Sequence, residues 1–106
     1  MPDQRPMSDF ERRRAAYALR HRREVEARSR GTHTEAQWQE LLTDCDHTCV
    51  KCWRYPCHLE KDHIVPISQG GSDHIRNIQP LCAWCNSGKG RDCTDHRPLH
   101  ARARKA

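Results

Sequence analysis

Two short cysteine pairs, Cys49–Cys52 (CVKC) and Cys82–Cys85 (CAWC), decide how this chain folds. Residues 53–81 lie between them. Two close pairs of thiolates can complete a tetrahedral zinc site, with each pair on its own turn of backbone. Zinc bound in this way joins the ends of the intervening segment. The predicted ligands of this structural Zn2+ are Cys49, Cys52, Cys82 and Cys85.

The rest of the composition explains why the fold needs a bound zinc ion that joins distant segments. The chain has 106 residues, of which 35% are hydrophobic, and thirteen are Val, Ile or Leu. A chain of this size and composition forms one small domain that buries little apolar surface. A structural zinc contributes about 10–16 kcal/mol of apparent binding free energy, which becomes folding free energy.

The cysteines favour metal binding over disulfides. No apolar run is long enough for a signal peptide or a membrane span, so we expect a reducing, cytoplasmic environment. The odd count of seven cysteines agrees with this interpretation. Cys57 and His58 lie close enough in sequence to replace one zinc ligand. Cys45 is expected to be buried, and Cys93 is expected to be a surface thiol.

Charge is unevenly distributed along the chain, which carries a formal net charge of +5. Residues 5–30 hold nine Arg against four acids, and residues 87–106 hold six Lys or Arg against two acids. The segment between them, residues 31–86, holds four basic and seven acidic residues. Basic flanks suit a polyanion such as a nucleic acid, and an acidic centre suits a divalent cation.

Local patterns predict three parts. Residues 1–33 form a basic N-terminal segment, helical from a capping box at Ser8 and Glu11. Residues 34–90 form the zinc-stapled domain, opening with an amphipathic helix that a second capping box at Thr34 and Gln37 begins. Residues 91–106 form a basic flexible tail. Within the domain, strands at 63–67 and 77–81 and a helix at 83–89 make a ββα unit.

The motif between and after the cysteine pairs resembles the HNH endonuclease family. The helix with Thr34 and Trp38, ahead of the first cysteine, also resembles the small bacterial and bacteriophage members of that family. The resemblance covers roughly residues 45–90. It rests on Lys61–Ser72 (KDHIVPISQGGS), Asn77–Cys82 (NIQPLC) and Cys85–Gly90 (CNSGKG). It implies a small α+β fold, a ββα-metal and treble-clef-like domain, and nicking or cleavage of DNA with one divalent cation, Mg2+, Mn2+ or Ni2+.

The resemblance also implies roles for individual residues. His63 is the candidate general base, because a neutral imidazole with an ordinary pKa of about 6.5 accepts a proton from water near neutral pH. Asp62 and Asn86 supply hard oxygen ligands for the catalytic cation. Asn77 ties down the loop and orients His63. Because neighbours on a strand point to opposite faces, Asp62 and His63 can serve one phosphate only at a bend or strand end.

Two functions fit these observations. The first is a DNA endonuclease, whose basic flanks hold phosphates and which acts as a homodimer or beside a phage DNA-processing partner when both strands are cut. The second is a zinc-stabilised nucleic-acid-binding module without catalysis. Lys89, just after Asn86, could contact a phosphate in either case.

Overall fold

The amphipathic helix predicted before the first cysteine pair is α2 (Glu35–Asp44) in the computed structural model, which describes residues 5–56 and 58–105. Its capping box forms in both directions: the Gln37 amide donates to Thr34 Oγ1 at 3.1 Å, and the Thr34 amide donates to Gln37 Oε1 at 2.9 Å. Trp38, Leu41 and Cys45 are buried on one face. This confirms the predicted apolar stripe.

The sheet has two antiparallel strands, β1 (Glu60–His63) and β2 (Ile78–Leu81), with Asp62 opposite Gln79. The prediction of a first strand at residues 63–67 was wrong in position, since β1 begins and ends earlier. Two features exclude Val65 and Pro66 from the ladder. Pro66 has no amide hydrogen, and the side chain of Asn77 takes both the amide and the carbonyl of Val65.

Helix α3 (Ala83–Ser87) follows β2 directly, so the ββα order holds as predicted. The helix ends two residues earlier than expected, with Gly88 as its C-cap. The small core lies between α2, β2 and the cysteine turns, and its fully buried members include Leu41, Val50, Ile78 and Leu81. Two short 3-10 turns, η1 (Ile67–Gln69) and η2 (Ile75–Asn77), complete the loop between the strands.

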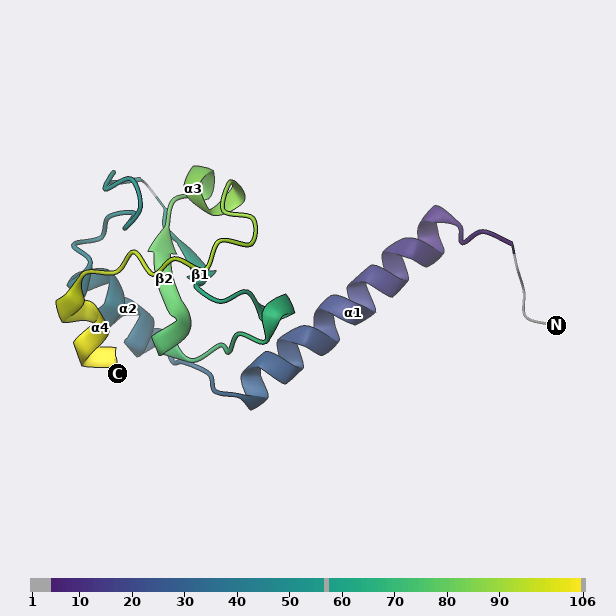
Figure 1. Ribbon diagram of the computed structural model, residues 1–106, viewed down its shortest axis with the longest axis horizontal. Helices are drawn as coiled ribbons and strands as arrows, with labels where there is room; N and C mark the ends of the chain where they lie inside the picture. Colours follow the sequence, from purple (N-terminus) through teal and green to yellow (C-terminus); the bar gives the residue numbers. More distant parts are fainter. Residues whose placement is uncertain (1–4, 57, 106) are drawn as a thin grey trace.

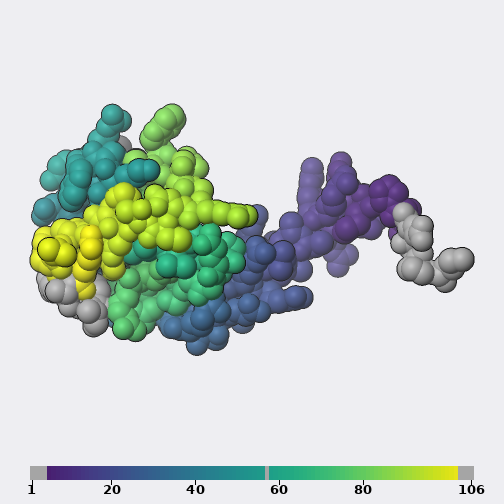
Figure 2. Space-filling model, in the orientation of Figure 1, coloured from purple at the N-terminus to yellow at the C-terminus, as the bar shows by residue number. Residues whose placement is uncertain are grey.

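Helix α1 (Asp9–Ser29) projects from the domain as an exposed arm (Figures 1 and 2). Ser8 caps it through the Glu11 amide, as the sequence predicts. Only its last turns touch the domain. Ala27 is fully buried, and Arg30 Nη2 donates to the Gly71 carbonyl at 3.0 Å. No helix in the described part of the chain is long and apolar enough to cross a membrane.

The segment after residue 90, predicted from composition as a flexible basic tail, packs on the domain through residue 102 and ends in α4 (Leu99–Lys105). Ala101 is fully buried, and His100 Nε2 lies 2.8 Å from the Asp44 carbonyl oxygen. The buried Arg97 is paired with Asp95 at 2.8 Å. The contact of His100 with Asp44 joins residues 56 positions apart, which is why the basic composition of the segment did not reveal it.

Candidate active site and metal centre

The four predicted zinc ligands converge. Cys49 and Cys52 lie on the turn after α2, while Cys82 caps α3 and Cys85 lies within it. One sulfur from each lies within 4.8 Å of the other three, and the Sγ atoms of Cys52 and Cys82 are 3.9 Å apart. Tetrahedral zinc with Zn–S bonds of about 2.3 Å places sulfurs roughly 3.8 Å apart. The cluster therefore fits a structural Zn2+.

The thiol environment also favours a bound cation. Burial acts to raise the pKa of Cys49, but hydrogen bonds from the backbone at Cys52, Cys82 and Lys51 outweigh it and lower that pKa to about 6. Burial and the neighbouring sulfurs raise the pKa of Cys85 to about 12. All four thiols can lose their protons together only when a metal ion compensates their charge. Of the alternative ligands, His58 is exposed and outside the cluster, and Cys57 lies outside the described residues.

His63 ends β1 and is held by a residue that the sequence analysis did not single out. Its Nε2 lies 2.9 Å from Asp73 Oδ1. When Nε2 carries the hydrogen of this bond, Nδ1 is left as the nitrogen that can accept a proton. Asp73 is the sole acid in residues 64–77, and that is the signal by which it could have been found.

Asp73 is itself fixed from the segment that follows α1. Thr32 Oγ1 donates to Asp73 Oδ2 at 3.1 Å, and His33 Nδ1 lies 2.6 Å from the Asp73 carbonyl oxygen. Burial acts to raise the pKa of the Asp73 carboxyl, but hydrogen bonds from His63 and Thr32 and the charges of His33 and His63 outweigh it, so the pKa lies below its ordinary value. The Asp73 side chain is therefore a carboxylate at neutral pH.

Asn77 closes the loop that carries these residues. Its Oδ1 accepts from the Val65 amide at 2.9 Å, and its Nδ2 donates to the carbonyls of Val65 and Ser72 at 3.0 and 2.8 Å. Gly71 lies so close that an added Cβ would stand 1.8 Å from the Val65 oxygen. The loop therefore requires a glycine at position 71 beside the amide at position 77.

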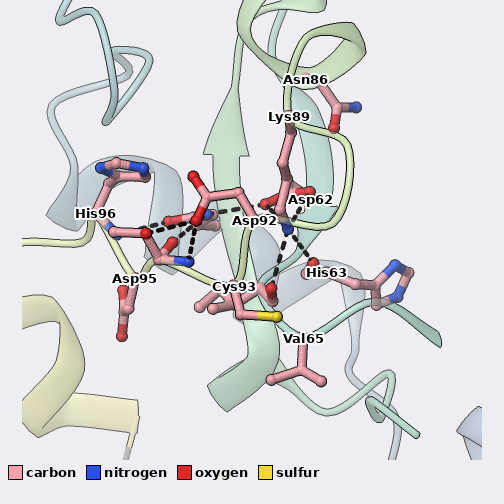
Figure 3. A network of polar contacts seen from close by, with 12 residues as sticks. Asp62, His63, Val65, Asn86, Lys89, Asp92, Cys93, Asp95 and His96 are labelled. Atoms are coloured by element: carbon pink, nitrogen blue, oxygen red, sulfur yellow. Dashed lines mark hydrogen bonds and ion pairs between the residues drawn. The ribbon is translucent and has the colours of Figure 1, made fainter. Parts of the chain in front are cut away.

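Asp62, the predicted cation ligand, is buried and already paired. The Lys89 ammonium lies 2.9 and 2.8 Å from its two carboxylate oxygens, and Gln79 Nε2 donates to Oδ2 at 2.9 Å. Lys89 also donates to the carbonyls of His63 and Ile64. Figure 3 shows Lys89 reaching Asp62 while the ring of His63 points away from that carboxylate. Lys89 therefore neutralises Asp62, a contact that sequence reasoning missed.

Asn86 lies on α3, next to strand β1. Its Nδ2 donates to Glu60 Oε1 at 2.8 Å, and Glu60 shares a face of β1 with Asp62 because the two are alternate residues. A cavity of about 290 Å³ is lined by Asp62, His63, Asn86 and Lys89, among others. The structure thus brings Asp62, His63 and Asn86 around one space, although their side chains do not converge on one point, and Asn77 does not line this cavity.

These residues fit a hard divalent cation in their chemistry, since Asp62 and Asn86, which carry a carboxylate and an amide oxygen, line the same cavity. A cation bound to Asp62 would compete with the Lys89 ammonium for the same two oxygens. The site therefore fits such a cation on the condition that Lys89 releases or shares the carboxylate.

Replacing one zinc ligand should abolish folding. In Cys82→Ser we expect loss of bound zinc and of cooperative thermal unfolding, because binding and folding free energy are coupled. The matched control is Cys93→Ser, which removes an exposed thiol outside the cluster. Zinc content by mass spectrometry and circular dichroism report both properties. A zinc-free Cys82→Ser protein with native circular dichroism would contradict the claim that the domain needs bound zinc to fold.

Removing Lys89 should destabilise the domain in a way that a divalent cation repairs. Lys89→Met leaves the buried Asp62 carboxylate unpaired, which costs about 3–5 kcal/mol, and millimolar Mn2+ should recover most of the loss in thermal midpoint. The control is Lys61→Met, which removes an exposed lysine of β1, the strand that carries Asp62. It should lower the free energy of unfolding by under about 1 kcal/mol, and Mn2+ should not raise its thermal midpoint. Absence of Mn2+ recovery in Lys89→Met would argue against a cation at Asp62.

The chain is similar to a known protein family over the region that forms this site. The family model described as HNH endonuclease matches residues 45–92. The chain is 33% identical over 55 residues to the protein named Anaredoxin from Nostoc sp., a match that covers 52% of this chain and 71% of that relative. No solved structure matches the chain. The matched region contains the four-cysteine cluster, the two strands, α3 and every residue placed around the cavity. Through this domain, the chain belongs to the HNH endonuclease family.

Proposed function

We propose that this domain is a metal-dependent DNA endonuclease that hydrolyses phosphodiester bonds. The observation that carries the proposal is the His63–Asp73 pair, with 2.9 Å between Nε2 and Oδ1, beside a cavity that Asp62 and Asn86 also line. An imidazole with one nitrogen tied to a carboxylate is held in one tautomer and orientation, which leaves its other nitrogen to act as a base.

Each residue then has a distinct task. His63 Nδ1 takes the proton of the attacking water, and the Asp73 carboxylate stabilises the imidazolium that forms. Asn77 keeps the loop closed so that His63 and Asp73 keep their separation. Asp62 and Asn86 would hold the divalent cation, Mg2+, Mn2+ or Ni2+, which when bound supplies charge stabilisation at the phosphate and the leaving oxygen. Lys89 balances the charge of Asp62 when no such cation is bound.

The proposed partner is DNA in the cytoplasm of a bacterial cell or a phage-infected host, with residues 34–90 as a treble-clef-like nuclease domain and residues 1–33 as its basic arm. One such site cuts one strand. A double-strand break would require two successive nicks, a homodimer, or a phage DNA-processing partner that supplies the second site.

A second function is a zinc-stabilised nucleic-acid-binding module without catalysis. The observation that favours it is the full engagement of Asp62 by Lys89 and Gln79, with 2.8–2.9 Å contacts to both carboxylate oxygens. If the cation cannot displace Lys89, the domain keeps its fold and its positive flanks but lacks the metal that hydrolysis requires.

Replacing His63 separates these two functions. On supercoiled plasmid with Mg2+, Mn2+ or Ni2+, the wild type should nick or linearise DNA, and His63→Ala should lose at least about 100-fold in rate, as expected for a general base. Zinc content and DNA affinity should be unchanged in this variant. His47→Asn is the control: His47 is exposed with a φ of 55°, a left-handed conformation that asparagine tolerates. Equal cleavage by His63→Ala would exclude His63 as the base, and an inactive wild type would favour the binding module.

The rate of cleavage should rise with pH across the range in which histidine side chains in general lose a proton, about pH 6 to 8. A histidine base works only in its neutral form, so protonation at lower pH removes activity and deprotonation restores it. The initial rate of plasmid nicking at saturating Mn2+ measures this, with zinc content checked at each pH. A rate that falls across the same interval would contradict a histidine base.

A further inference from the structure

Helix α1 is an exposed arm that carries most of the positive charge of the N-terminal segment. Its 21 residues include seven Arg and four acids. Within the described residues, no ion pair engages Arg13, Arg20 or Arg23, whereas Arg12 is paired with Asp9. A set of uncompensated guanidinium groups on an exposed helix attracts a polyanion.

These three arginines lie on one face of α1. Arg13 and Arg20 are seven residues apart, about two helical turns, and Arg23 is one turn beyond Arg20. Ala27 lies one turn further and is fully buried against the domain. We name Arg13, Arg20 and Arg23 the arginine face. It runs along the side of α1 that leads into the domain. Arg22, by contrast, lies about half a turn of the helix away from Arg20.

The arginine face is continuous with the candidate active site. Arg20 and Arg23 line a cavity of about 360 Å³ whose far wall is Ile67 and Ser68 of η1. Ile67 also lines the cavity at Asp62 and His63, and it borders a third cavity of about 200 Å³ with His63 and Asp73. A strand seated at His63 would thus leave the site along η1 toward the arginine face.

The angle of α1 to the domain is fixed by contacts with the motif loop. The Asp73 amide donates to the Ala27 carbonyl at 3.4 Å, and Arg30 donates to the Gly71 carbonyl. Asp73 also holds His63, so the same loop positions the candidate base and the arm. Glu24 borders two of the cavities, so its carboxylate reduces the positive charge there.

We propose that the arginine face holds the sugar-phosphate backbone of duplex DNA on one side of the bond that His63 addresses. This inference rests on the proposed function and adds to it the surface and the direction of the DNA. Arg13 to Arg23 covers about 15 Å of helix axis, the axial length of about four base pairs of B-form DNA. The contacts are to phosphates, so they add affinity and orientation without sequence selection.

The test measures binding of a fluorescent 20-base-pair duplex to zinc-loaded, full-length protein without a hard cation, over a range of salt concentration. Arg20→Gln/Arg23→Gln should lose two phosphate contacts. The plot of log association constant against log salt concentration should then become less steep by about 2, and the affinity at 0.1 M salt should fall on the order of 10- to 100-fold. The matched control is Arg14→Gln/Arg22→Gln, with the same change of net charge on the opposite face, and it should retain the wild-type slope. Circular dichroism verifies that α1 is intact in both.

Two outcomes would overturn the proposal. An equal loss of slope in both double variants would mean that overall charge, not this face, binds DNA. An unchanged slope in both would mean that α1 does not contact the duplex. Because the measurement needs no cleavage, a wild type that never cuts plasmid would refute the nuclease, while a face-specific loss of slope would still support the DNA-binding surface.

Discussion

The fold depends on the joining of two distant turns by four cysteine sulfurs. The first turn follows α2 and the second caps α3, and the strands lie between them. The Val50 amide donates to the Pro80 carbonyl at 3.1 Å, which ties the first cysteine turn to β2. Since Asn86 and Lys89 follow Cys85 closely, the position of the second turn also determines where these side chains meet β1. A core of this size would not hold that geometry without a metal.

Strand β1 divides the candidate site into two charged halves. On one face Asp62 is neutralised by Lys89, and at the end of the strand His63 is paired with Asp73. Each partner comes from a different loop, so the charge balance of the site requires the complete fold. The two halves border one cavity instead of forming one cluster. This arrangement is consistent with a base on one side of a phosphate and a cation on the other, and it makes Lys89 the group that any cation must displace.

Local signals predicted most of the framework. The cysteine pairs, the Thr34 capping box and the Trp38, Leu41 and Cys45 stripe all depend on residues a few positions apart, and all form as expected. The end of β1 was missed because the side chain of Asn77, and not a neighbouring strand, binds the backbone of Val65. The Asp73 and Lys89 contacts and the packing of residues 91–102 were missed because they join distant segments. Their residue types are common on exposed surfaces, so spacing along the chain does not mark them.

The link between the zinc and the site can be measured directly by amide hydrogen exchange. The amides of Ile64 and Val65 are bonded to the carbonyl and the side chain of Asn77, in the loop between the two strands. Zinc removal by a chelator should abolish their protection together with that of Val50. Protection that persists at Ile64 and Val65 in zinc-free protein would show that the loop folds without the metal, and the account would fail.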